Sequence, residues 1–193
     1  MKLSLLIKVS ILAALSTLLM HLRFPIFPAH PYLPYDPSEV PALIASFALG
    51  PLPGMAVVVL KNSLYMLLHF APSEFLGIPA NTAAGCTLAG VAGHVYRLRK
   101  TKSIALVSLS LGVVAMTLVM LPVNLVILPI FFRFFMPSMQ SQQTLTFIMS
   151  VITPYNIIKG SLTAFLTFLV YKRVSPLLKS QSEGEKTRLS KPL

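Results

Sequence analysis

Apolar residues fill this chain in six segments, and short polar or proline-containing stretches separate them. Most of these segments approach or exceed the roughly 20 apolar residues that an α-helix needs to cross a bilayer. The pattern therefore predicts an all-α integral membrane protein built as a bundle of six transmembrane helices. The apolar segments cover residues 4–22, 40–49, 55–70, 80–96, 104–135 and 145–174.

The first connection is rich in proline, with prolines at positions 25, 28, 31, 34 and 37. Each proline fixes its own φ and disfavours helix at the preceding residue. Residues 24–37 are therefore predicted to form an extended loop that caps one side of the bundle. Ser38 is the expected N-cap of the second helix, and a tight turn over residues 50–54 is expected to separate that helix from the third.

Prolines also predict where the later helices start or break. The fourth helix is expected to open after Pro79, where Asn81 serves either as a cap or as a ligand contact. Pro122 and Pro129 predict a fifth helix followed by an irregular lead-out, and Pro154 predicts an interruption in the sixth helix.

Composition supports a membrane domain. Of the 193 residues, 55% are hydrophobic and only 11% are charged, and the mean hydropathy is +0.77, whereas soluble domains carry about 25% charged residues. We predict one membrane domain over residues 1–174 and a charged, disordered tail over 175–193. No small-x-small cleavage site follows residues 4–22, so this segment is expected to be a retained helix and not a signal peptide.

The formal net charge of +11 is explained by where the basic residues lie. They gather at the ends of apolar segments and in the tail, which is typical of the cytoplasmic side of a membrane protein and not of a nucleic-acid-binding surface. We expect a multi-pass protein of a prokaryotic plasma membrane, with both termini cytoplasmic and the proline-rich loop outside. Arg23 and Arg133 would lie outside, and the twelve cytoplasmic residues would be Lys2, Lys8, Arg97, Arg99, Lys100, Lys102, Lys172, Arg173, Lys179, Lys186, Arg188 and Lys191.

Three polar residues within the apolar segments suggest a binding site. A lysine in mid-span costs at least about 2.5–3.5 kcal/mol, so Lys159 requires compensation. Asn156 lies one turn earlier on the same helix face, and Asn124 lies on the preceding segment. The three groups are expected to hydrogen-bond a flat, amide-rich molecule, with a clasp between helices as the alternative.

Other polar residues leave more than one reading open. Lys61 either extends toward the membrane surface, pairs with Asp36 or Glu39, or contacts a ligand. The two acids are either a charge pair at a helix N-terminus or part of the loop that covers the site. The four histidines lack ligand spacing and the single cysteine, Cys86, excludes a cysteine-based zinc site, so no metal site is expected.

No motif of an enzyme is present. The sequence contains no phosphate-binding P-loop, no HExxH and no GxSxG pattern, and its five acidic residues are too few for metal-assisted or proton-relay chemistry. We therefore predict that this chain is not an enzyme and needs no cofactor. No clear inverted repeat supports a self-sufficient transporter.

The chain resembles the substrate-binding S components of energy-coupling factor transporters, and specifically their riboflavin-binding members. The similarity runs from the first helix to about residue 172. The segments that carry it are YDPSEVPAL at 35–43, LGP at 49–51 with Gly54, LKN at 60–62, PVN at 122–124 with LP at 128–129, and PYNIIKG at 154–160.

This resemblance implies that six helices enclose one riboflavin under the loop between the first two helices. It implies that Asn124, Asn156 and Lys159 hydrogen-bond the flavin ring. The chain would capture the vitamin from outside for uptake driven by a membrane coupling subunit and two cytoplasmic ATPase subunits. The full predicted binding set is Leu33, Tyr35, Asp36, Lys61, Asn81, Asn124, Asn156 and Lys159.

The resemblance also implies a docking face for the coupling subunit on the first helix, where small residues permit close approach. The predicted docking residues are Ser10, Ala13, Ala14 and Thr17. Besides its partner subunits and riboflavin, the chain would contact membrane lipid but no nucleic acid. The alternatives are an S component for another vitamin, for FMN or for a flavin analogue, and a membrane scaffold protein that binds no ligand.

Overall fold

The structure is a computed structural model that describes residues 3–69, 71–72, 74–137 and 144–189. It is an all-α fold, as expected, with one two-stranded ribbon in the first connection. The elements are α1 (Leu3–Leu19), β1 (Phe24–Pro25), β2 (Pro34–Tyr35), α2 (Glu39–Leu49), α3 (Pro51–Leu68), α4 (Glu74–Leu98), α5 (Lys102–Phe135), α6 (Thr144–Phe147), the π-helical η2 (Ile148–Ile152) and α7 (Thr153–Leu189).

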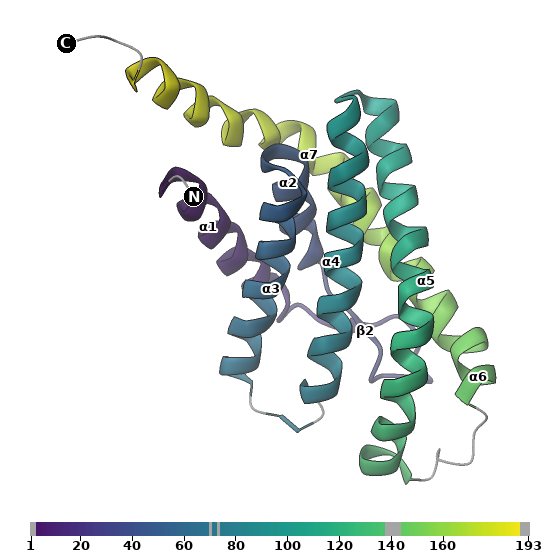
Figure 1. Cartoon of the computed structure of the whole chain (residues 1–193). Coiled ribbons are helices and arrows are strands. Elements are labelled where there is room, and N and C mark those ends of the chain that lie inside the picture. Colours follow the sequence, from purple (N-terminus) through teal and green to yellow (C-terminus); the bar gives the residue numbers. More distant parts are fainter. Residues whose placement is uncertain (1–2, 70, 73, 138–143, 190–193) are drawn as a thin grey trace.

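Helices α3, α4 and α5 run along one common direction, α1 and α7 are tilted against them, and the short connections lie at two opposite ends (Figure 1). We call one end of the bundle the loop end. It holds the connection from α1 to α2, the last residues of α3 and the first residues of α4. The last part of α7 extends away from the bundle at the opposite end, where both chain termini lie.

Small residues allow α4 and α5 to pack closely. Gly112 of α5 lies against α4 so tightly that a Cβ there would come within 3.0 Å of Leu88 Cδ1 and 3.1 Å of the Leu88 carbonyl oxygen. Ala89 and Ala92 of α4 are buried beside this contact. Close backbone approach through small residues is characteristic of helices that pack within membranes.

The outward faces of the helices are apolar. On α5, Leu106, Leu111, Leu118 and Leu125 each expose between 47 and 59% of their surface. Among the described residues, three helices are long and apolar enough to cross a membrane, namely α3, α4 and α5, and α1 and α2 are shorter apolar helices. Contiguous exposed apolar surface of this extent is expected where lipid, and not water, surrounds the protein.

The junction between α2 and α3 is shorter than the expected turn over residues 50–54. Helix α3 already begins at Pro51, and only Gly50 departs from helical geometry, with φ of +116°. Proline is well tolerated at the first helical position, because its missing N–H has no helical partner there. Glycine alone tolerates the positive φ that reverses the chain.

Two further helix boundaries also differ from the predictions. Helix α4 begins at Glu74, so Pro79 lies inside it and Asn81 does not cap its start. Helix α5 continues without a break through Pro122 and Pro129, so the irregular lead-out is wrong. Each proline removes only one backbone donor. In a membrane bundle, groups on neighbouring helices can bond the backbone carbonyl that this leaves free.

The expected interruption of the last apolar segment exists but precedes Pro154. It is the π-helical turn η2, which separates α6 from α7, and the Thr153 hydroxyl donates a hydrogen bond of 2.9 Å to the Ile148 carbonyl across it. Helix α7 then continues to Leu189, beyond residue 174. The division into a domain over 1–174 and a disordered tail over 175–193 stays a prediction, and residues 190–193 lie outside the described part.

The proline-rich connection folds back on itself as a short antiparallel ribbon. Phe24 pairs with Tyr35, and Pro25 pairs with Pro34. The Tyr155 hydroxyl of α7 donates a hydrogen bond of 2.7 Å to the Pro34 carbonyl. The connection is thereby tied to the helix that carries the predicted site.

Candidate functional site

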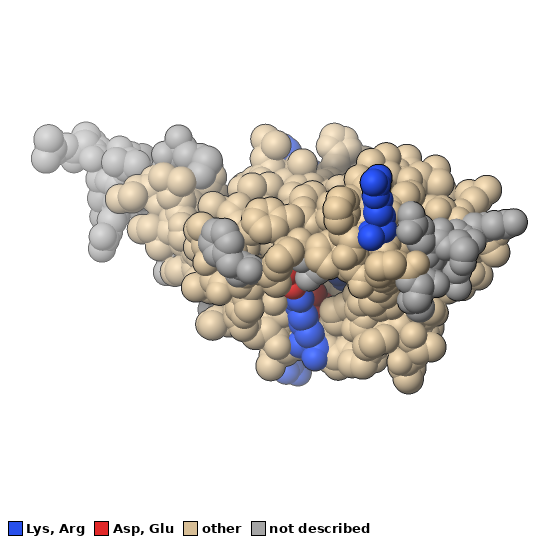
Figure 2. Space-filling view, turned by 90° about the horizontal axis from the view of Figure 1, so that it is seen from below, with Lys and Arg blue, Asp and Glu red and all other residues tan. Residues whose placement is uncertain are grey.

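A cavity of about 730 Å³ opens at the loop end of the bundle. Viewed from that end, the face is hollowed near its middle, with acidic and basic side chains beside the hollow (Figure 2). The volume lies within the roughly 300–1,000 Å³ typical of small-molecule sites. Its walls come from the connection between α1 and α2 and from α4, α5 and α7, and include Tyr32, Leu33, Asp36, Asn81, Met120, Asn124, Phe131, Ile152, Tyr155, Asn156 and Lys159.

Apolar and aromatic side chains form much of the cavity wall. The rings of Tyr32 and Phe131 lie 5.9 Å apart between centroids, and Met120, Ile152 and Tyr155 also line the space. A planar aromatic ligand gains both apolar burial and ring contacts in such surroundings.

Two asparagines face this space from α5 and α7, and each is held by its own helix. Asn124 donates a hydrogen bond of 2.7 Å to the Met120 carbonyl. Asn156 donates one of 3.0 Å to the Ile152 carbonyl. An amide group has two N–H donors and one carbonyl acceptor, so each side chain keeps an acceptor and a second donor for a ligand.

A lysine completes the polar part of the wall. Lys159 is buried, with only 8% of its surface exposed, and its ammonium group donates a hydrogen bond of 2.8 Å to Asn81 Oδ1 on α4. Asn81 in turn donates to Asn62 Oδ1 on α3 at 3.3 Å, and Asn62 donates to Thr82 Oγ1 at 2.9 Å. These bonds fix the ammonium group while leaving further N–H donors for a ligand.

The connection between α1 and α2 supplies a carboxylate. Asp36 is buried and lines the cavity. Burial alone would raise the pKa of Asp36, but the nearby ammonium groups of Lys159 and Lys61 and the hydrogen bonds from Ser38 lower it below the ordinary value. The carboxylate is therefore ionised at neutral pH and acts as a hydrogen-bond acceptor.

The structure brings together most of the binding residues expected from the sequence. Six of the eight line the cavity, and the two that do not are Tyr35 and Lys61. The ring of Tyr35 packs against Phe24, with 5.2 Å between centroids. Lys61 lies behind the wall and pairs with Glu39 at 2.6 Å, so of its open readings the pairing is the one observed.

Two charged lining residues are absent from the set that the sequence predicts. Arg23 and Glu74 form an ion pair of 2.8 Å, and both belong to the cavity wall. The Arg23 guanidinium also lies 4.4 Å from the centroid of the Tyr65 ring. The two charged residues are 51 positions apart, and no local pattern in the sequence indicates that they meet.

The four predicted docking residues do not share one face of α1. Ala13 and Thr17 are buried in the bundle, and the Thr17 hydroxyl donates to the Ala13 carbonyl at 2.9 Å. Ser10 and Ala14 are exposed. A docking role therefore stays a prediction, and only the exposed pair is accessible from outside the bundle.

Comparison with known proteins gives one consistent result. Residues 4–171 match the family described as "ECF transporter, substrate-specific component". The chain is 33% identical over 175 residues to "Riboflavin transporter RibU" of Staphylococcus aureus, covering 90% of this chain and 92% of that protein. It is 34% identical over 189 residues to "Riboflavin transporter FmnP" of Bacillus subtilis, covering 94% and 97%.

A solved structure gives the same fold. It is described as "Structure and mechanism of the S component of a bacterial ECF transporter". This chain superimposes on it with a TM-score of 0.77 at 31% identity, over 91% of this chain and 97% of that one.

Proposed function

The chain belongs to the substrate-specific components of energy-coupling factor (ECF) transporters, and we propose that it binds riboflavin in the cavity at the loop end. The observation that carries this proposal is the convergence of Asn124, Asn156 and Lys159 on one cavity with apolar and aromatic walls. The similar proteins of S. aureus and B. subtilis are both named riboflavin transporters.

The chemistry of riboflavin matches this arrangement. One edge of its flat ring system carries an imide N–H between two carbonyl groups and thus alternates acceptor, donor and acceptor. The free carbonyl and N–H groups of Asn124 and Asn156, with the ammonium group of Lys159, supply partners of both kinds. The ring faces would lie against residues such as Phe131 and Tyr155, and the ribityl hydroxyls would donate to Asp36.

The charges of the cavity wall favour a neutral ligand. Two basic residues, Arg23 and Lys159, and two acidic residues, Asp36 and Glu74, line the space. Riboflavin is neutral and adds no unpaired charge, whereas the phosphate of FMN would add negative charge next to two carboxylates. We therefore place riboflavin ahead of FMN among flavin ligands.

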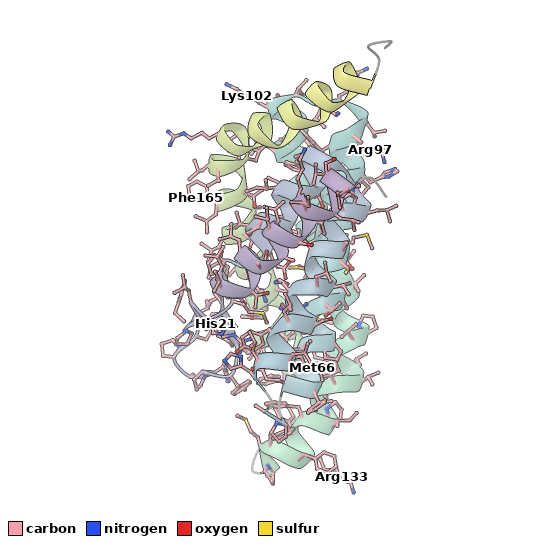
Figure 3. The ribbon with its side chains drawn as sticks, turned by 90° about the vertical axis from the view of Figure 1, so that its left-hand side faces the viewer. His21, Met66, Arg97, Lys102, Arg133 and Phe165 are labelled. Atoms are coloured by element: carbon pink, nitrogen blue, oxygen red, sulfur yellow. The ribbon has the colours of Figure 1, made fainter. Side chains whose placement is uncertain are left out.

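Six membrane passages and an outward-facing cavity complete the proposal. Arg97 and Lys102 lie at the end of the bundle opposite Arg133 (Figure 3). Because basic residues concentrate on the cytoplasmic side, the cavity would open to the outside of a prokaryotic plasma membrane. Uptake would be driven by a membrane coupling subunit and two cytoplasmic ATPase subunits, and this chain would capture the vitamin without hydrolysing ATP.

A binding experiment on the detergent-purified chain tests the assignment. Riboflavin added to the protein should lose its fluorescence on binding, with saturation near one flavin per chain. Asn156→Ala should weaken the binding while leaving the yield of folded protein largely unchanged. A well-folded protein that does not quench riboflavin would overturn the riboflavin assignment, and equal losses of yield and binding would favour the scaffold alternative.

A further inference from the structure

Lys61 is buried completely in the middle of α3, although it does not touch the cavity. Its ammonium group lies 2.6 Å from Glu39 Oε1 at the start of α2 and also donates a hydrogen bond to the Ser38 hydroxyl. An ammonium group removed from water is costly unless it is paired and hydrogen-bonded. These contacts explain how α3 accommodates a lysine.

The same contacts lead to the cavity wall through Ser38. The backbone N–H of Ser38 donates a hydrogen bond of 3.0 Å to Asp36 Oδ1, and the Ser38 hydroxyl donates to the same oxygen. A continuous path of hydrogen bonds thus connects Lys61 on α3 with Asp36. Since Asp36 lines the cavity, the position of its carboxylate depends on groups that no ligand touches.

Helix α4 supplies the space that this arrangement needs. A Cβ on Gly85 would come within 2.6 and 2.7 Å of the two carboxylate oxygens of Glu39, and within 2.8 Å of Val58 Cγ1. Only glycine at this position leaves room for the carboxylate. The pair formed by Glu39 and Lys61 is therefore built into the contact of three helices, α2, α3 and α4.

We propose that Lys61 is a positioning residue for the ligand. Through Ser38 it holds Asp36 and the end of the connection between α1 and α2 in place against the cavity, and it thereby slows ligand release. The proposal rests on the proposed function, because riboflavin is the ligand whose release is measured. Its structural part, the attachment of this connection to α3, is tested without any ligand.

Charge balance determines which variants are informative. Lys61→Met alone leaves Glu39 as a buried, unpaired carboxylate, which is strongly destabilising. The double variant Glu39→Gln/Lys61→Met removes one positive and one negative charge together, so it is expected to fold. Ser38→Ala keeps both charges and cuts only the hydroxyl link to Asp36, and it is a second, independent test.

The experiment measures riboflavin release from the purified full chain, by dilution of the complex and recovery of flavin fluorescence. We expect the double variant and Ser38→Ala to release riboflavin at least about tenfold faster than the wild type, with an association rate within about threefold. Lys100→Met, at an exposed lysine, is the matched control and should leave both rates unchanged.

A double-mutant cycle links the effect to Asp36. Asp36→Asn should accelerate release in the wild-type background but add little to the double variant, because both changes affect the same contact. Wild-type release from a stably folded double variant, or full additivity with Asp36→Asn, would overturn the proposal. A purely structural role of Lys61 predicts wild-type release once stability is restored.

Hydrogen exchange without ligand separates this proposal from the riboflavin assignment. If Lys61 attaches the connection to α3, the amides of the non-proline residues within 33–38 should exchange faster in the double variant and in Ser38→Ala than in the wild type and in Lys100→Met. Unchanged exchange would overturn the positioning role. If the wild type fails to bind riboflavin but exchange responds as expected, the proposed function fails and the positioning role stands.

Discussion

Removal of the Lys159 ammonium group is the sharpest test of the polar part of the cavity. Lys159→Met keeps the length and apolar character of the side chain but removes its charge and its donors. In the structure the ammonium group makes one hydrogen bond, to Asn81 at 2.8 Å, and the residue is 92% buried from solvent. Lys159 lines the cavity, so its remaining N–H donors can be used by a ligand that binds there.

The expected loss follows from the kind of bond that is removed. A hydrogen bond from a charged donor contributes about 1.5–3 kcal/mol. If one such bond is made to the flavin ring, the dissociation constant for riboflavin should rise by about 10- to 150-fold. The stability of the unliganded protein should change less, because the positive charge of Lys61 still lies near the Asp36 carboxylate.

Fluorescence titration of the purified variant measures this loss. The matched control is Lys100→Met, which removes a lysine at an exposed position that does not line the cavity. A folded Lys159→Met protein whose affinity stays within threefold of the wild type would refute the contact between the ammonium group and the ligand. The cluster of Lys159, Asn81 and Asn62 would then serve only to join α7, α4 and α3.

Three further predictions concern the same region. Asn156→Ala should raise the dissociation constant for riboflavin by about 5- to 30-fold, since neutral hydrogen bonds contribute about 1–2 kcal/mol when a buried partner is left unsatisfied. Isothermal or fluorescence titration measures this constant, and an unchanged value contradicts the assigned contact. FMN should bind at least about tenfold more weakly than riboflavin, because its phosphate adds negative charge beside two carboxylates. Competition titration compares the two ligands, and equal affinity would show that the cavity accommodates the phosphate. Gly85→Ala should destabilise the protein by about 1–2 kcal/mol, since overpacking against Glu39 exceeds the gain in helix propensity. Thermal unfolding in detergent measures it against Gly90→Ala, where a Cβ meets only the flexible side chain of Met55 at 3.2 Å and stability should hold or rise.

The sequence indicated the polar wall of the cavity because its residues follow helix geometry. Asn156 and Lys159 are one turn apart on one apolar segment, and such groups in mid-membrane are too costly to occur without partners. Asn124 and the proline-rich connection were recognised in the same way, from isolated polar or helix-breaking residues in apolar surroundings. Local spacing was sufficient for these parts.

Contacts between distant segments were not accessible to the same reasoning. The partner of Lys61 stayed open among three readings, since Glu39 lies 22 positions away on another helix. The pair of Arg23 and Glu74 was missed for the same reason. The packing of α2 against α3 decides the first pairing. The second depends on where the connection between α1 and α2 lies against the start of α4, and no helix repeat encodes either arrangement.

Several prolines of this chain are accommodated within helices and do not break them. Pro51 starts a helix, and Pro79 and Pro122 lie inside helices. In a bundle surrounded by lipid, the alternative to helix is an unsatisfied backbone, which costs more than one missing hydrogen bond. The break before α7 is instead a π-helical turn, which no residue type in that stretch announces.

The way in which Asn124 and Asn156 are held bears on the thermodynamics of recognition. Each amide group is fixed by a carbonyl of its own helix, four residues earlier, in the absence of any ligand. Ordering a free polar side chain on binding costs about 0.5–1.5 kcal/mol, and for these two residues most of that entropy has already been lost during folding. In the proposed complex, α5 and α7 would therefore present a pre-ordered template to the flavin edge.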